Sequence, residues 1–210
     1  LVYGVSPTSS GLRMLPLMAG LLTASITSGR IISRIGRYKP FPIAGCATTT
    51  VGMFLLSRLQ VETPPWLASV YMLVVGLGIG LTMQVLVLAV QNCAPPKDVG
   101  VATSAATFFR SMGGSLGVAL FGAIFAARLS SELAQFPPAI AARFSGGLDI
   151  SPDEVHGLPA EARDEFLHAF VAALGPVFLV GAALTAVAFG LAWALREVPL
   201  RGARPPAEPQ

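Results

Sequence analysis

The sequence predicts an all-α polytopic membrane protein with five transmembrane helices. Hydrophobic residues make up 53% of its 210 positions and charged residues only 12%, and the mean hydropathy is +0.68. Soluble domains rarely reach this balance. The apolar residues are gathered into five stretches, each near the length of about 20 residues that crosses about 30 Å of hydrocarbon. The segments between these stretches differ in charge from one to the next, which is typical of a multi-pass chain.

The expected spans follow from where the apolar stretches begin and end. We place them near residues 11–32, 41–60, 66–91, 99–127 and 167–195. Pro16 in the first span and Pro176 in the last are tolerated in membrane helices when neighbouring groups satisfy the freed carbonyls. The segments between the spans are rich in turn-forming residues.

The domain organisation predicted from these spans has five parts. They are an outer loop remnant over 1–10, four helices over 11–127 with a basic cytoplasmic loop at 30–40, a polar acidic extracytoplasmic connection over 128–165, a last helix over 166–196, and a cytoplasmic tail without fixed structure over 197–210. The chain lacks an initial Met and a cleavable signal peptide, so we interpret it as part of a longer polypeptide.

The loop charges predict the orientation of the chain. One side carries the cations Arg30, Arg34, Arg37, Lys39, Lys97, Arg196, Arg201 and Arg204. The other side carries the carboxylates Glu62, Glu132, Asp149, Asp153, Glu154, Glu161, Asp164 and Glu165. Lys and Arg are retained in cytoplasmic loops. We therefore expect the basic loop and the C-terminus to face the cytoplasm, and the protein to lie in the plasma (inner) membrane.

Two polar side chains are expected deep inside spans. Arg110 lies near the middle of the fourth span and Gln84 deep in the third. A buried arginine in hydrocarbon costs at least about 2.5–3.5 kcal/mol, so it should face a cavity or the interior of a bundle. Two interpretations of Arg110 stay open, a structural pin between helices and a place on a substrate or coupling pathway. We favour the second for Arg110, whereas the neutral amide of Gln84 is more typical of contacts between helices.

Glycines with a spacing of four residues predict close helix packing. The pairs are Gly76 with Gly80 and Gly113 with Gly117. Such pairs allow the backbone of a neighbouring helix to approach closely. A dinucleotide-binding loop is excluded by the glycine spacing and by the absence of a strand-to-helix pattern.

Several functional classes are disfavoured by what the spans contain. The cations stand at the ends of apolar stretches rather than in one stripe, so we expect no nucleic-acid partner. No cluster of metal ligands or pair of nucleophile and base is visible, and we expect neither a cofactor nor enzyme activity. No Asp or Glu lies within the apolar body of a span. A group that couples transport to protons would therefore come from a part of the protein outside this chain.

The basic segment resembles the signature loop of the Major Facilitator Superfamily. Its characteristic residues are Gly29, Arg30, Arg34, Gly36, Arg37 and Lys39. It departs from the better-known form of that loop at Ser33, where an aspartate is usual. The glycine-rich third span and the stretch from Gly100 through Arg110 to Gly117 resemble the C-terminal part of the fourteen-span drug:proton antiporters of the EmrB/QacA type.

This resemblance implies a transporter that exports amphipathic or cationic small molecules in exchange for protons, with this chain as the last five helices of a larger bundle in the lipid bilayer. It implies that the N-terminal part of the same transporter is a partner, and that the six residues of the signature loop form a cytoplasmic gate. Arg37 and Lys39 are equally explained as anchors that set the orientation. The alternative function is a membrane scaffold without transport activity that assembles through its glycine faces.

Overall fold

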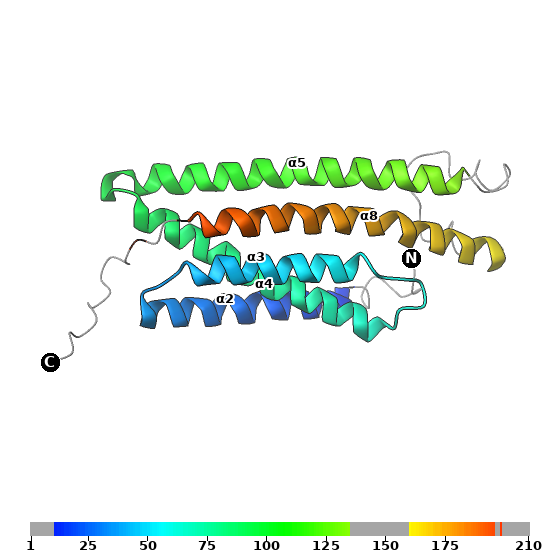
Figure 1. Ribbon diagram of the computed structural model, residues 1–210, viewed down its shortest axis with the longest axis horizontal. Helices are drawn as coiled ribbons and strands as arrows, with labels where there is room; N and C mark the ends of the chain where they lie inside the picture. Colours follow the sequence, from blue (N-terminus) through cyan, green and yellow to red (C-terminus); the bar gives the residue numbers. More distant parts are fainter. Residues whose placement is uncertain (1–10, 135–159, 196–197, 199–210) are drawn as a thin grey trace.

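The computed structural model describes residues 11–134, 160–195 and 198, and helices account for nearly all of them. The elements are α2 (Leu15–Ile35), α3 (Pro40–Leu56), α4 (Pro65–Cys93), the short 3-10 helix η1 (Pro96–Asp98), α5 (Val99–Leu133) and α8 (Ala160–Trp193). They lie side by side in an elongated bundle that α4 crosses at an angle (Figure 1). No strand occurs in these three segments, and the predicted all-α class is confirmed.

Four of the helices are long and apolar enough to cross a membrane, namely Gly11–Ile35, Pro65–Cys93, Pro96–Leu133 and Arg163–Trp193. The fifth, α3, has 17 residues, which gives a length of about 25 Å and lies at the lower limit for a span. The described part of the chain is thus a multi-pass membrane bundle with four full-length helices and one shorter apolar helix.

Helix α3 ends earlier than the expected span over 41–60. The backbone N–H groups of Arg58 and Leu59 bond to carbonyls three residues back, at 3.1 and 3.2 Å, and the Ser57 hydroxyl donates to Phe54 O at 2.6 Å. These bonds tighten the last turn and end the α-helix at Leu56. Residues 57–60, the end of the expected span, therefore lie in a turn and not in the helix.

Helix α2 ends later than expected and shortens the basic loop. Gly29, Arg30 and Arg34 lie on α2, and the loop consists only of residues 36–39. This corrects the expected loop over 30–40. Long arginine side chains allow a helix to continue toward water, because their charged ends reach out of the apolar layer while the backbone bonds remain satisfied.

The two longest helices also run into the expected connection over 128–165. Helix α5 continues to Leu133 and α8 begins at Ala160. The rest of that connection, together with the expected outer remnant over 1–10 and the tail over 197–210 except for Val198, lies outside the described residues.

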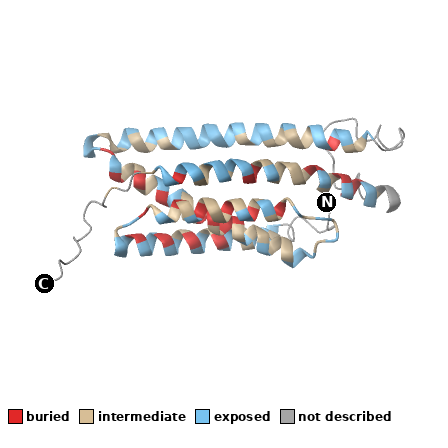
Figure 2. Cartoon of the chain, in the orientation of Figure 1, coloured by how far each residue is buried: buried red, intermediate tan, exposed pale blue. Residues whose placement is uncertain are grey.

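Helix packing is uneven across the bundle. Helix α4 packs against both α2 and α3, α3 also packs against α8, and α8 packs against α5. Threonine hydroxyls join α3 to α8 through Thr50 and Thr185 at 3.1 Å, and Phe125 meets Phe170 edge to face between α5 and α8. Buried residues gather where α2, α3 and α4 meet, whereas α5 is exposed along most of its length (Figure 2).

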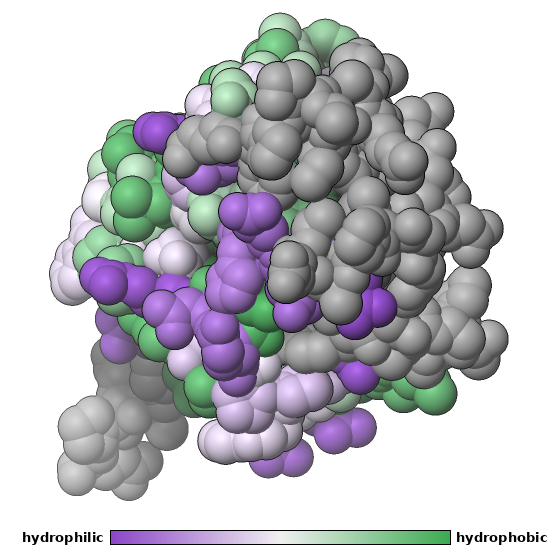
Figure 3. All heavy atoms as spheres, turned by 90° about the vertical axis from the view of Figure 1, so that its right-hand side faces the viewer, coloured by the Kyte–Doolittle hydropathy of each residue, from purple (hydrophilic) through white to green (hydrophobic). Residues whose placement is uncertain are grey.

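The two ends of the bundle collect different connections. The loop between α2 and α3, the helix η1 and the last turn of α8 lie at one end, and the turn after α3, the end of α5 and the start of α8 lie at the other (Figure 1). At this second end His168 Nε2 lies 3.5 Å from Glu62 Oε1. Figure 3 looks onto this end and shows hydrophilic residues gathered there, with hydrophobic residues around the sides.

Candidate functional site

The packing of α2 against α4 depends on glycines at their crossing. A β-carbon on Gly20 would lie 2.6 Å from the carbonyl oxygen of Leu73, and β-carbons on Gly76 and Gly80 would overlap the backbone carbonyls of Leu17 and Leu21. Since real β-carbons do not approach backbone atoms so closely, only glycine fits this crossing. The predicted Gly76/Gly80 pair lies on this face.

A second set of glycines brings α3 against the opposite side of α4. A β-carbon on Gly78 would lie 2.6 Å from the backbone nitrogen of Thr49, and one on Gly52 would lie 3.0 Å from that of Val75. Gly78 is two residues from Gly76, so the two project to nearly opposite sides of a helix. This second face was not predicted because its α3 partners, Gly45 and Thr49, are spaced by four residues but are not a pair of glycines.

The other predicted glycine pair has a different environment. A β-carbon on Gly113 or Gly117 would meet no atom within 4 Å among the described residues. The α5 surface that carries them includes exposed Phe108, Met112 and Leu116. That Gly113 and Gly117 pack against another helix therefore stays a prediction, because no described helix lies against them.

The basic loop begins with a glycine that needs an unusual backbone conformation. Gly36 has φ 74° and ψ 5°, and its N–H bonds to Ile32 O at 2.8 Å. A left-handed residue after the last turn is the ordinary way to end a helix, and it favours glycine. Arg37 follows on the exposed side, while Ser33, where the sequence departs from the signature, donates its hydroxyl hydrogen to Arg30 O at 2.9 Å.

Tyr38 is the residue of the loop that sequence analysis did not single out. Its side chain is fully buried, in a cluster with Ile32, Val85 and Ala89. Its neighbours Arg37 and Lys39 flank it in sequence, so the cations are held at the end of the bundle by a buried aromatic ring between them. The sequence did contain a signal for this buried residue, because Tyr38 is an aromatic residue between two cations.

The Tyr38 hydroxyl also contacts the C-terminal segment of the chain. It accepts a hydrogen bond from Val198 N at 3.1 Å, and Asn92 Nδ2 at the end of α4 donates to Val198 O at 3.0 Å. The backbone N–H and C=O groups of Val198 are thus both hydrogen-bonded, one to the side chain of Tyr38 and the other to the side chain of Asn92. Tyr38 of the loop, Asn92 at the end of α4 and Val198 are thus joined by hydrogen bonds. We call these three residues the end cluster.

Arg110 and Gln84 lie at similar depths on different helices. At about 1.5 Å per residue, Arg110 is about 16 Å from the start of α5 at Val99, and Gln84 is about 14 Å from the end of α4 at Cys93. Both are exposed in the described part of the chain. Between these helices a side-chain hydrogen bond joins Gln91 to Thr103 at 3.4 Å near the shared turn, and from there the helices diverge (Figure 1). The described contacts do not bring Arg110 and Gln84 together.

A profile described as "Major Facilitator Superfamily" matches residues 1–118, more than half of the 210 residues. The chain belongs to the Major Facilitator Superfamily. The match contains the basic loop, α2, α3 and α4, and it extends to the middle of α5, where Arg110 and Gly113 lie. The superfamily resemblance seen in the sequence is therefore confirmed.

Relatives of this superfamily chain include named transporters. An uncharacterized MFS-type transporter of Mycobacterium tuberculosis strain H37Rv is 46% identical over 95% of this chain and 29% of its own length. The multidrug transporter protein MdtP of Bacillus subtilis strain 168 is 31% identical over 100% of this chain and 43% of its own length. A protein named "Tetracycline resistance determinant" from Streptomyces rimosus is 29% identical over 94% of this chain and 64% of its own length. The chain spans less than half the length of the first two relatives.

Proposed function

We propose that the full-length protein is a secondary transporter that exports amphipathic or cationic small molecules in exchange for protons. The superfamily membership and the similarity to a multidrug transporter and to a tetracycline resistance determinant support this activity. In this proposal the chain is the C-terminal part of a fourteen-span antiporter of the EmrB/QacA type. It lies in the plasma membrane with its C-terminus in the cytoplasm.

The observation that carries the proposal is the exposed arginine on α5. Arg110 lies at mid-depth on a helix of which only Leu129 is buried against the described residues. An arginine at this depth is too costly to face hydrocarbon. We therefore assign the α5 surface around Arg110 to the central cavity between the two halves of the transporter, with Gln84 lining the same space from α4.

The basic end of the bundle is assigned to the cytoplasmic gate. Gly29, Arg30 and Arg34 on the last turns of α2, with Gly36, Arg37 and Lys39 in the loop, would contact the N-terminal half in one state and release it in the other. A switch requires contacts that differ between its states. The end cluster supports this assignment because it gives the loop a fixed base on α4.

The scaffold alternative is weakened by the packing of α4. The Gly76/Gly80 face is already occupied by α2 within this chain. It is therefore not available for a separate membrane partner. The small residues around Gly113 are open in the described structure, and we assign them to the N-terminal half of the same transporter.

Replacing Arg110 tests the proposal in the full-length protein. Arg110→Ala should reduce proton-driven dye efflux in inverted vesicles by at least about tenfold, which corresponds to about 1.4 kcal/mol. The physical reason is the loss of the cation that α5 carries at mid-depth on the assigned cavity face. Initial rates of dye transport, normalised to the amount of inserted protein, measure this effect.

Arg128→Ala is the matched control, because Arg128 is also an exposed arginine on α5 but lies beyond the apolar body of the helix. It should leave efflux within about twofold of wild type, as expected for a solvated surface charge. Wild-type efflux in Arg110→Ala, or equal losses in both variants, would contradict the assignment of Arg110 to the pathway.

A further inference from the structure

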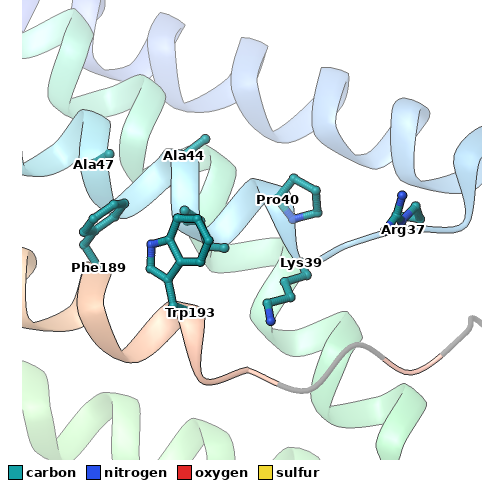
Figure 4. A pocket seen from close by; sticks show the side chains of 8 residues that line it. Arg37, Lys39, Pro40, Ala44, Ala47, Phe189 and Trp193 are labelled. Atoms are coloured by element: carbon teal, nitrogen blue, oxygen red, sulfur yellow. The ribbon is translucent and has the colours of Figure 1, made fainter.

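An open cavity of about 420 Å³ lies between α3 and α8 at the basic end of the bundle. It is separate from the α5 surface assigned to transport. Its volume falls in the usual range for small-molecule sites, about 300–1,000 Å³. Figure 4 shows Phe189 and Trp193 rising from α8 toward Ala44 and Ala47 of α3, with Arg37 and Lys39 at the loop end. The cavity therefore has an apolar part and a cationic part.

The charge of the lining indicates an anionic ligand. Arg37 and Lys39 provide two positive charges, and the other six lining residues, Pro40, Ile43, Ala44, Ala47, Phe189 and Trp193, carry none. None of these eight described lining residues carries a carboxylate. A cationic cargo would be repelled by these side chains, whereas a phosphate would be attracted and would accept their hydrogen bonds.

The position of the cavity indicates a ligand at the membrane surface. Lys39 directly precedes α3, and Trp193 is the last residue of α8. Tryptophan and the cations at helix ends are typical of the boundary between hydrocarbon and headgroups. Trp193 is 61% exposed and meets Phe189 edge to face with ring centroids 6.3 Å apart. The apolar part of the cavity extends from this level along both helices.

We propose that the cavity binds an anionic phospholipid. Its phosphate lies at Arg37 and Lys39, and one acyl chain lies between α3 and α8 against Ile43, Ala44 and Phe189. A basic pocket between membrane helices on the cytoplasmic side provides this type of recognition. The proposal depends on the membrane placement of the chain and does not depend on the transported substrate.

Quenching of Trp193 fluorescence tests lipid binding in the full-length protein. The protein is reconstituted in phosphatidylcholine vesicles that contain increasing fractions of brominated phosphatidylglycerol, and in matched vesicles with brominated phosphatidylcholine. The signal of Trp193 is the difference between wild type and Trp193→Phe. Two positive charges near the surface, at about 1 kcal/mol each, predict a preference for phosphatidylglycerol of up to about thirtyfold.

Charge variants test whether the preference belongs to this cavity. Arg37→Gln with Lys39→Gln should bring the preference close to one, whereas Arg30→Gln with Arg34→Gln removes the same charge from α2 at the same end and should retain it. Ala44→Leu narrows the apolar part without changing charge, and it should reduce quenching by both brominated lipids.

Other occupants predict different results, each of which would overturn the proposal. Equal loss of preference in the two double variants would indicate only the general surface charge. Displacement of brominated phosphatidylglycerol by millimolar inorganic phosphate would indicate a site for a free anion, and displacement by a cationic dye would indicate a cargo site. Absence of Trp193 quenching would show that protein, from the same transporter or a second copy, fills the cavity.

Discussion

At the scale of single residues, Tyr38 connects several elements at the basic end of the bundle. Its ring is buried with Ile32 of α2 and Val85 of α4, while its hydroxyl accepts the hydrogen bond from Val198 N. Its Oη also lies 3.9 Å from Cys93 Sγ. One side chain thus joins two helices, the loop and the C-terminal segment, and its ring and its hydroxyl make separable contributions.

The hydroxyl contribution is tested by Tyr38→Phe in the full-length protein. The ring stays buried, but the Val198 amide loses its acceptor, at a net cost of about 1 kcal/mol. Hydrogen–deuterium exchange of the peptide that contains Val198 should become about fivefold faster. Mass spectrometry of that peptide measures the change.

Tyr71→Phe provides the control for this prediction. It removes the same atom from α4 near the opposite end of the bundle, far along the helix from Asn92. Exchange at Val198 should be unaltered in this variant. Unchanged protection in Tyr38→Phe would show that the hydrogen bond contributes nothing to holding the C-terminal segment.

At the scale of elements, α4 and α5 differ most in how their glycines are used. Glycines of α4 face backbone on two sides, while those of α5 have no described neighbour within 4 Å. Both helices show the same small-residue spacing in sequence. The difference arises because spacing alone does not say which helix, if any, lies opposite.

The close crossing of α2 and α4 is tested by Gly76→Ala in the full-length protein. The added methyl group overlaps the Leu17 backbone, and a backbone cannot move aside as a flexible side chain can. The stability should fall by about 1–3 kcal/mol, the usual cost of overpacking. Denaturant titration of purified protein in detergent measures it.

Gly29→Ala is the matched substitution, because Gly29 is also a helical glycine but has open space where its β-carbon would be. Here alanine should be neutral or should stabilise α2 by up to about 1 kcal/mol. Equal stability of Gly76→Ala and Gly29→Ala would argue that the crossing is looser than the structure describes.

The helices could be predicted from apolar length, but their ends and partners could not. The structure moves the end of α2 from residue 32 to Ile35 and the end of α3 from residue 60 to Leu56. Hydropathy follows the apolar layer, whereas helix ends follow local hydrogen bonds such as those of Gly36 and Ser57. Tyr38 was missed because its partners Cys93 and Val198 are 55 and 160 residues away in sequence.

At the scale of the whole molecule, the cavity assignment depends on a face that the described chain leaves uncovered. Arg110, Phe109 and Gly113 could be found from sequence as features of one helix. Their common exposure is a structural result, because no other described helix covers this part of α5. In the function that we propose, this face contacts the N-terminal half of the full-length transporter.

The proposed coupling to protons is tested by Asp98→Asn in the full-length transporter. Asp98 is in η1, next to the first residue of α5, and it is the carboxylate nearest to a span body on that side. Because we place the coupling carboxylate outside this chain, the variant should keep proton-driven efflux within about twofold, with at most about 1 kcal/mol lost at the helix N-terminus.

The measurement follows dye efflux and the internal pH of the same vesicles. A variant that still moves dye down its gradient but no longer responds to a proton gradient would show that Asp98 takes part in coupling. That result would place the coupling group within this chain and contradict the proposal.

The glycine contacts on both sides of α4 also limit how this part of the protein moves. Rotation of α4 by one residue would bring Leu77 or Ile79 against a backbone that only glycine can approach. Packed helices with such contacts change position in discrete steps rather than continuously. For the transport cycle that we propose, we therefore predict that α2, α3 and α4 move together as one body, and that displacements fall at the sparser contacts of α5 with α4 and α8.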